Sequence, residues 1–148
     1  MGLHRLLGFT TAVPDPAAVA SFYGELGLSG DGAVFSGSDG GATVHLEEAA
    51  FRRLVRVEFG ADGPEDVARV TRRLTAGGAE PRGDDEEVRV VDPGSRVELV
   101  VRVAVRTPVQ APAAPVVPNA PGATVRADER APAVFGSPRP PRRLGHLV

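Results

Sequence analysis

Residues 7–28, LGFTTAVPDPAAVASFYGELGL, decide the fold because they join a strand to a capped helix. The run over 6–13 alternates apolar residues with small or threonine residues, as a strand does. Asp15 can then cap a helix that has Pro16 at its first position and ends at Gly27. One face of this helix is apolar and consists of Val19, Phe22, Tyr23 and Leu26.

The same strand–helix pattern recurs 48 residues later in the chain. A strand is predicted over 54–59, and the segment 60–78, GADGPEDVARVTRRLTAGG, predicts a second helix that begins at Pro64. Either Asp62 or Gly63 can be its cap. The shift of 48 superposes Leu7 on Val55, Phe9 on Val57, Thr11 on Phe59, Pro16 on Pro64, Val19 on Val67, Phe22 on Val70 and Leu26 on Leu74.

Short strands separated by glycine-rich turns follow each helix. They are predicted over 33–36 and 42–47 around the turn GSDGG, and over 88–91 and 96–102 around the turn DPGS. Each copy thus reads as a strand, a helix and two or three further strands. We expect an α+β fold in which residues 1–103 form two tandem copies of this unit, paired around a common cleft.

The composition of the chain changes after residue 103. Nine of the 14 prolines lie between residues 107 and 141, in a stretch rich in alanine. Proline cannot donate the hydrogen bonds of a sheet, so residues 104–141 are predicted to be an extended Pro/Ala-rich linker. Residues 142–148, RRLGHLV, look like the first strand of a further, truncated module.

The overall composition excludes several classes of function. The net charge of −2 argues against a nucleic-acid partner. The chain has no cysteine, and all 17 of its basic residues are arginine, which excludes thiolate and lysine chemistry. No run of about 18 apolar residues and no signal peptide is present, so we expect a cytoplasmic protein without membrane contact.

The repeated pattern resembles the vicinal oxygen chelate superfamily, which includes glyoxalase I, bleomycin-resistance proteins and extradiol dioxygenases. The resemblance rests on LGFTTAVPDPAAVASFYGELGL in the first copy and on GPEDVARVTRRLTAGGAE and VVDPGSRVELVV in the second. It implies βαβββ modules that pair into a half-barrel. In members that bind a metal, the ligands lie on the first and last strands of each module.

The ligand positions that the resemblance implies carry few metal ligands in this chain. The first-strand positions fall on Gly8 or Phe9 and on Val55 or Arg56, and none of these residues coordinates a metal. The last-strand positions fall, in contrast, on His45 and Glu98. Two protein ligands are fewer than a catalytic metal normally has, so the sequence predicts a metal-free module pair with no tightly bound cofactor.

Strand alternation places further polar residues in the cleft. Val44 and Leu46 should face the helices, so Thr43, His45 and Glu47 should face the cleft. The same alternation places Arg56, Glu58, Arg96 and Glu98 there. We predict either a structural network of paired charges or contacts to a ligand. His4 should be a solvated residue near the terminus, and Tyr23 should be a packing residue.

The final residues carry a second resemblance. In two-domain extradiol dioxygenases, a linker follows an inactive module pair, and a Gly-His step then opens the catalytic pair with the first iron ligand. Gly145-His146 is similar to that opening, with His146 as one ligand of an incomplete metal site. The resemblance implies a longer parent protein that uses Fe(II) to cleave a small aromatic diol, whereas the 148-residue chain itself should be inactive.

The alternative is a binding protein. The module pair could sequester a small molecule in the manner of the glyoxalase and bleomycin-resistance group, without a metal. The sequence leaves open whether the chain forms a homo-oligomer.

Overall fold

The computed structural model describes residues 2–38, 40–41, 43–108 and 141. All of its helices and strands lie between Leu3 and Val103. Most of the predicted linker, and the predicted strand 142–148 with His146, lie outside the described residues. Neither described helix has the length and apolar composition that crossing a membrane requires.

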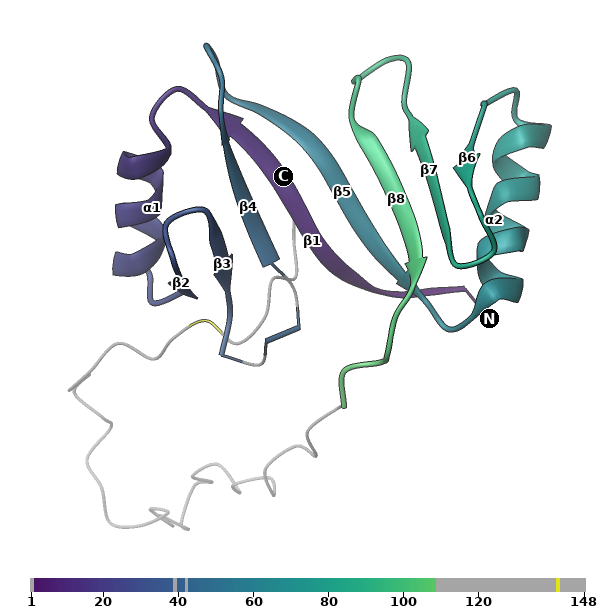
Figure 1. The fold of residues 1–148 in the computed structure, drawn as a ribbon, viewed down its shortest axis with the longest axis horizontal. Helices are drawn as coiled ribbons and strands as arrows, with labels where there is room; N and C mark the ends of the chain where they lie inside the picture. The colour runs from purple at the N-terminus through teal and green to yellow at the C-terminus, as the bar shows by residue number, and fades with distance from the viewer. Residues whose placement is uncertain (1, 39, 42, 109–140, 142–148) are drawn as a thin grey trace, which may run out of the picture. The chain divides into compact units, whose positions relative to one another are not determined.

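The chain forms a mixed α+β fold with one eight-stranded sheet (Figure 1). The first half contributes β1 (Leu3–Val13), α1 (Pro16–Glu25), β2 (Ser29–Gly30), β3 (Val34–Ser36) and β4 (Thr43–Glu48). The second half contributes β5 (Arg53–Ala61), α2 (Pro64–Ala76), β6 (Arg82–Gly83), β7 (Glu87–Val91) and β8 (Glu98–Val103). The strand order across the sheet is β2-β3-β4-β1-β5-β8-β7-β6.

The two halves meet at an antiparallel pair of strands, β1 and β5, in the middle of the sheet. Gly8 lies opposite Glu58, and Thr10 lies opposite Arg56. The sequence offset of 48 residues maps Gly8 onto Arg56 and Thr10 onto Glu58. A two-fold axis between the strands therefore relates these two pairs. The parallel pairing of β1 with β4 and of β5 with β8 follows the same relation.

The helix boundaries follow from local chemistry. Asp15 caps α1, because its Oδ1 accepts a hydrogen bond of 2.9 Å from the Ala18 amide. Just beyond the end of α1, Gly27 has a φ of 92°, a conformation that glycine adopts without strain. Of the two candidate caps of α2, the cap is Gly63, whose backbone is extended. Asp62 is instead bound by Arg106.

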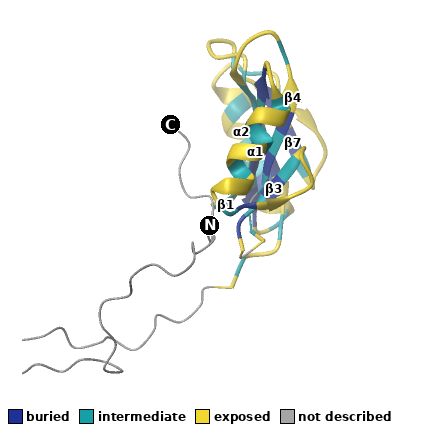
Figure 2. Ribbon diagram, turned by 90° about the vertical axis from the view of Figure 1, so that its left-hand side faces the viewer, coloured by how far each residue is buried: buried dark blue, intermediate teal, exposed yellow. Residues whose placement is uncertain are grey.

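Each helix covers its own cluster of buried side chains, and both helices lie on the same side of the sheet (Figure 2). Under α1, the cluster consists of Leu28, Phe35, Val44 and Leu46. Tyr23 packs there with its ring centroid 5.5 Å from that of Phe35, which confirms its predicted packing role. Under α2, the cluster consists of Ala61, Val67, Val88 and Val101. The other face of the sheet is therefore free to present polar side chains.

The first strand is longer than predicted, and the prediction for His4 was wrong. Strand β1 begins at Leu3 rather than at Leu6, because it pairs with β5 as far as Ala61. His4 is consequently part of the sheet rather than a solvated terminus. Its Nε2 lies 3.0 Å from the carbonyl oxygen of Ala104, beyond the end of β8.

Candidate functional site

A row of four polar residues crosses the four central strands of the sheet. Thr10 on β1 lies opposite His45 on β4 and opposite Arg56 on β5. Arg56 lies in turn opposite Glu98 on β8. We call Thr10, His45, Arg56 and Glu98 the polar row.

The polar row lies on the face of the sheet that the helices leave uncovered. On β4, Val44 and Leu46 belong to the cluster beneath α1, so His45 between them points to the opposite face. On β8, Val101 belongs to the cluster beneath α2, and the alternation of side chains places Glu98 opposite it. Three members of the polar row, His45, Arg56 and Glu98, are among the residues that the sequence predicts to line a cleft.

Charged side chains on this face bind one another. The Arg56 Nε donates to Glu98 Oε2 over 2.5 Å, and an Arg102 nitrogen lies 3.3 Å from Glu58 Oε2. Both pairs join β5 to β8, which are adjacent strands. The side chains of Arg56 and Glu98 are 37% and 26% exposed, so solvent weakens this pair without removing it.

On its β4 side, Gly8 lies opposite the uncharged residue Thr43. An added Cβ on Gly8 would lie 2.6 Å from both the carbonyl oxygen and the hydroxyl of Thr43. The same hydroxyl lies 2.9 Å from His45 Nε2 and holds the imidazole in place. Thr43 therefore fills the space beside Gly8 that a larger first-strand residue would need.

Arg96 lies in the turn before β8 and not in the strand, which corrects the predicted strand over 96–102. Strand β8 begins at Glu98, and Arg96 is an exposed turn residue with a φ of 60°. The reason is the turn at Asp92, whose Oδ2 accepts hydrogen bonds from the Ser95 amide and hydroxyl at 2.6 and 2.7 Å. These bonds lower the pKa of Asp92 and extend the turn by two residues beyond the predicted DPGS.

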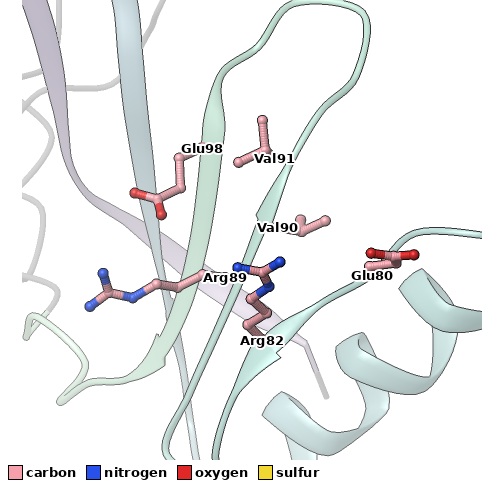
Figure 3. A pocket seen from close by; sticks show the side chains of 6 residues that line it. All are labelled: Glu80, Arg82, Arg89, Val90, Val91 and Glu98. Carbon is pink, nitrogen blue, oxygen red and sulfur yellow. The ribbon is translucent and has the colours of Figure 1, made fainter.

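A cavity of about 360 Å³ opens beside the polar row (Figure 3). It is lined by Glu98 of the row together with Glu80, Arg82, Arg89, Val90 and Val91. Arg82 and Arg89 are cross-strand neighbours on β6 and β7. The cavity thus presents two guanidinium groups and two carboxylates beside an exposed valine, Val91.

The charges lining this cavity are coupled to the rest of the face. Arg89 Nε donates to Glu87 Oε1 over 2.6 Å, and this hydrogen bond is the largest cause of the raised pKa of Arg89. The charges of Glu98 and Glu58 raise it further. Arg89 therefore remains a cation at all physiological pH values and contributes to a network of paired charges.

The residues of the polar row do not fit a metal centre. His45 and Glu98 can donate electron pairs to a metal, but Arg56 stands between them in the row and is itself a cation. Within the described part of the chain, no group of three or more His, Cys, Asp or Glu side chains is placed to hold a metal ion. The donor set is thus smaller than that of a catalytic metal.

Comparison with known proteins identifies the fold. No protein-family model and no curated protein sequence match the chain. Among solved structures, the Mn(II)-bound glyoxalase from Novosphingobium aromaticivorans aligns with a TM-score of 0.58 and 19% identity over 76% of this chain. Homoprotocatechuate 2,3-dioxygenase from Brevibacterium fuscum, in complex with 3,4-dihydroxyphenylacetate, aligns with a TM-score of 0.55 and 18% identity over 72% of this chain.

The chain has the vicinal oxygen chelate fold. It spans 42% of the length of the glyoxalase chain and 39% of the length of the dioxygenase chain. The resemblance to this fold, inferred from the two repeated strand–helix segments, is thereby confirmed. An identity below 20% to both proteins means that the likeness concerns the backbone arrangement alone.

Some residues of this face were missed from the sequence. Thr10 was not singled out, because the sequence left the cleft position of the first strand open between Gly8 and Phe9. Arg82 was missed because β6 is only two residues long and was not predicted, whereas Arg89 lies on a predicted strand and was not singled out. Arg102 could have been found, because it alternates with Glu98 along the same predicted strand.

Proposed function

We propose that the chain is the N-terminal, non-catalytic portion of an iron(II)-dependent extradiol dioxygenase-like protein and is inactive by itself. The observation that carries the proposal is the position of Arg56 in the polar row. A guanidinium bound to Glu98 leaves His45 without a second metal ligand beside it. This module pair would then serve as a tandem βαβββ scaffold, joined to the rest of the protein by the Pro/Ala-rich segment.

Two further features support the proposal. The aligned part covers 33% and 39% of two homoprotocatechuate 2,3-dioxygenase chains, which leaves room in those proteins for a second, catalytic module pair. Gly145-His146 resembles the opening of such a pair, and His146 would provide one iron ligand from this chain. The other ligands and the aromatic diol pocket would belong to the remainder of the parent protein.

A ring-cleavage assay tests this proposal. The 148-residue chain, supplied with Fe(II) and 3,4-dihydroxyphenylacetate or catechol in air, should give no yellow ring-opened product. A longer form encoded by the same gene should give it. In that longer form, His146→Ala should abolish turnover, while His45→Ala serves as the matched control and should retain it. Ring cleavage by the 148-residue chain would overturn the proposal.

A second candidate function is the binding of a small molecule, and the cavities favour it. The chain has the charged cavity of about 360 Å³ and, separately, a groove of about 320 Å³ on the α1 side. Phe9, Phe22 and Tyr23 are among the residues that line this groove. Both volumes are at the lower end of ligand pockets. Titration with bleomycin, followed by calorimetry, tests this candidate. A Kd at or below about 10 µM would favour the binding protein over the dioxygenase portion.

A further inference from the structure

The proposed function requires that position 56 carry no metal ligand, but it does not require a positive charge there. Where a metal-binding row would carry a third electron-pair donor, this row carries a permanent cation, Arg56. Its Nε is hydrogen-bonded to Glu98, the single carboxylate of the row. Leucine or valine at position 56 would also have removed a ligand, but neither would have neutralised Glu98.

We propose that the Arg56 guanidinium replaces the metal ion of this fold as the resident cation of the polar row, and that it excludes divalent cations from it. This inference goes beyond the proposed function, because it concerns four side chains of this chain and holds whether or not a catalytic part follows.

The first argument is charge balance. Glu98 is about a quarter exposed, and a carboxylate in such a place is stabilised by a cation close to it. Arg56 supplies that cation from the neighbouring strand at 2.5 Å. A metal ion would have to displace this contact to reach Glu98, and a divalent ion within about 4 Å of a guanidinium would be strongly repelled.

The second argument is the order of the side chains. Directly opposed residues on neighbouring strands have their Cβ atoms about 4.5–5.5 Å apart. Position 56 is thus the direct neighbour of Glu98 in the row, and Thr10 and then His45 follow on the next two strands. Histidine at position 56 would place an imidazole beside Glu98, and the row would then contain two imidazoles and one carboxylate, the ligand types that hold Fe(II) in non-haem oxygenases.

The third argument comes from the two-fold relation between the halves. The position equivalent to Arg56 in the first half is Gly8, where Thr43 fills the space that a side chain would need. Both first-strand positions are thus closed to a metal in different ways, by a neighbouring threonine at Gly8 and by a cation at Arg56. A single substitution of the partly exposed Arg56 side chain could make position 56 available to a metal ion, whereas Gly8 has no side chain to replace.

The test compares divalent-ion binding by the wild-type chain, two single variants and one double variant. Co(II) binding is followed by visible absorption, and Mn(II) binding by calorimetry. We expect Arg56→His to bind at least about tenfold more tightly than Arg56→Gln, which removes the charge without adding a ligand. We expect the wild-type chain to bind most weakly. Adding Glu98→Gln to the Arg56→His variant should abolish the gain.

Each outcome decides the question. Wild-type binding as tight as that of Arg56→His would overturn the inference, since Arg56 would then exclude nothing. Equal binding by Arg56→His and Arg56→Gln would also overturn it, because the imidazole would then not join the row. Far-UV circular dichroism checks that each variant folds. If Arg56→His does not fold, Arg56→Glu provides the same comparison with a carboxylate donor.

Discussion

At the scale of single residues, Gly8 shows how closely β1 and β4 approach. Any side chain there would contact the backbone of Thr43, which is part of the sheet and cannot rotate away. We therefore expect Gly8→Ala to destabilise the protein by about 1–3 kcal/mol, the usual range for overpacking. Urea denaturation followed by circular dichroism measures this change.

A second glycine provides the control for this experiment. Gly24 lies within α1, and a Cβ added there would meet no atom within 4 Å. Gly24→Ala should therefore stabilise the protein slightly, by up to about 1 kcal/mol, because alanine favours the helix. If Gly8→Ala proved as harmless as Gly24→Ala, the close packing of Thr43 against Gly8 would be refuted.

The ion pair between Asp62 and Arg106 predicts a dependence of stability on pH. Arg106 donates two hydrogen bonds to the Asp62 carboxylate, at 2.5 and 2.7 Å, and they lower the pKa of Asp62 below its usual 3.8. A lowered carboxyl pKa stabilises the fold above the unfolded-state pKa, and this contribution is lost as the pH falls through the folded-state value. The ion pair should thus stabilise the fold at neutral pH, and this stabilisation should be lost in acid.

Thermal unfolding of Asp62→Asn tests this dependence. Its melting temperature should lie below that of the wild-type chain at neutral pH, and the two should converge as the pH falls through the lowered pKa of Asp62. Asp85→Asn, which changes an exposed carboxylate in the turn before β7, controls for the loss of one negative charge. A gap between Asp62→Asn and wild type that persists unchanged into acid would contradict the assignment.

At the scale of elements, the two helices differ in how they begin. Asp15 caps α1 with its side chain, whereas Gly63 begins α2 without a side-chain hydrogen bond. Asp15→Ala should cost about 1 kcal/mol of unfolding free energy. Gly63→Ser should instead gain a few tenths of a kcal/mol, because a Cβ there meets no neighbouring atom. Chemical denaturation of both variants checks the opposite signs.

The elements also show what the sequence could predict. Both helices begin and end at Asp, Pro and Gly residues whose effect is local, so their positions were predicted to within about two residues. The start of β1 and the turn at Arg96 were not predicted, because they depend on pairing with β5 and on hydrogen bonds to Asp92. Thr10 was missed for the same reason, since strand register is set by partners distant in the sequence.

At the scale of the whole molecule, one continuous sheet joins two separate hydrophobic clusters. Val44 and Val67 are both fully buried, the first beneath α1 and the second within α2. β1 pairs with β4 of its own half and with β5 of the other half. A substitution that loosens the packing of one cluster should therefore also destabilise the other, because the central strands connect them.

This coupling predicts a single unfolding transition. Val44→Ala and Val67→Ala each remove two methyl groups from a filled site, and each should lower the free energy of unfolding by about 2 kcal/mol. Because the sheet is shared, each variant should shift one cooperative transition, seen alike by calorimetry and far-UV circular dichroism. Exposed Val105, replaced by Ala, is the matched control and should leave it in place. Two transitions, of which each variant shifted one, would show that the halves fold independently.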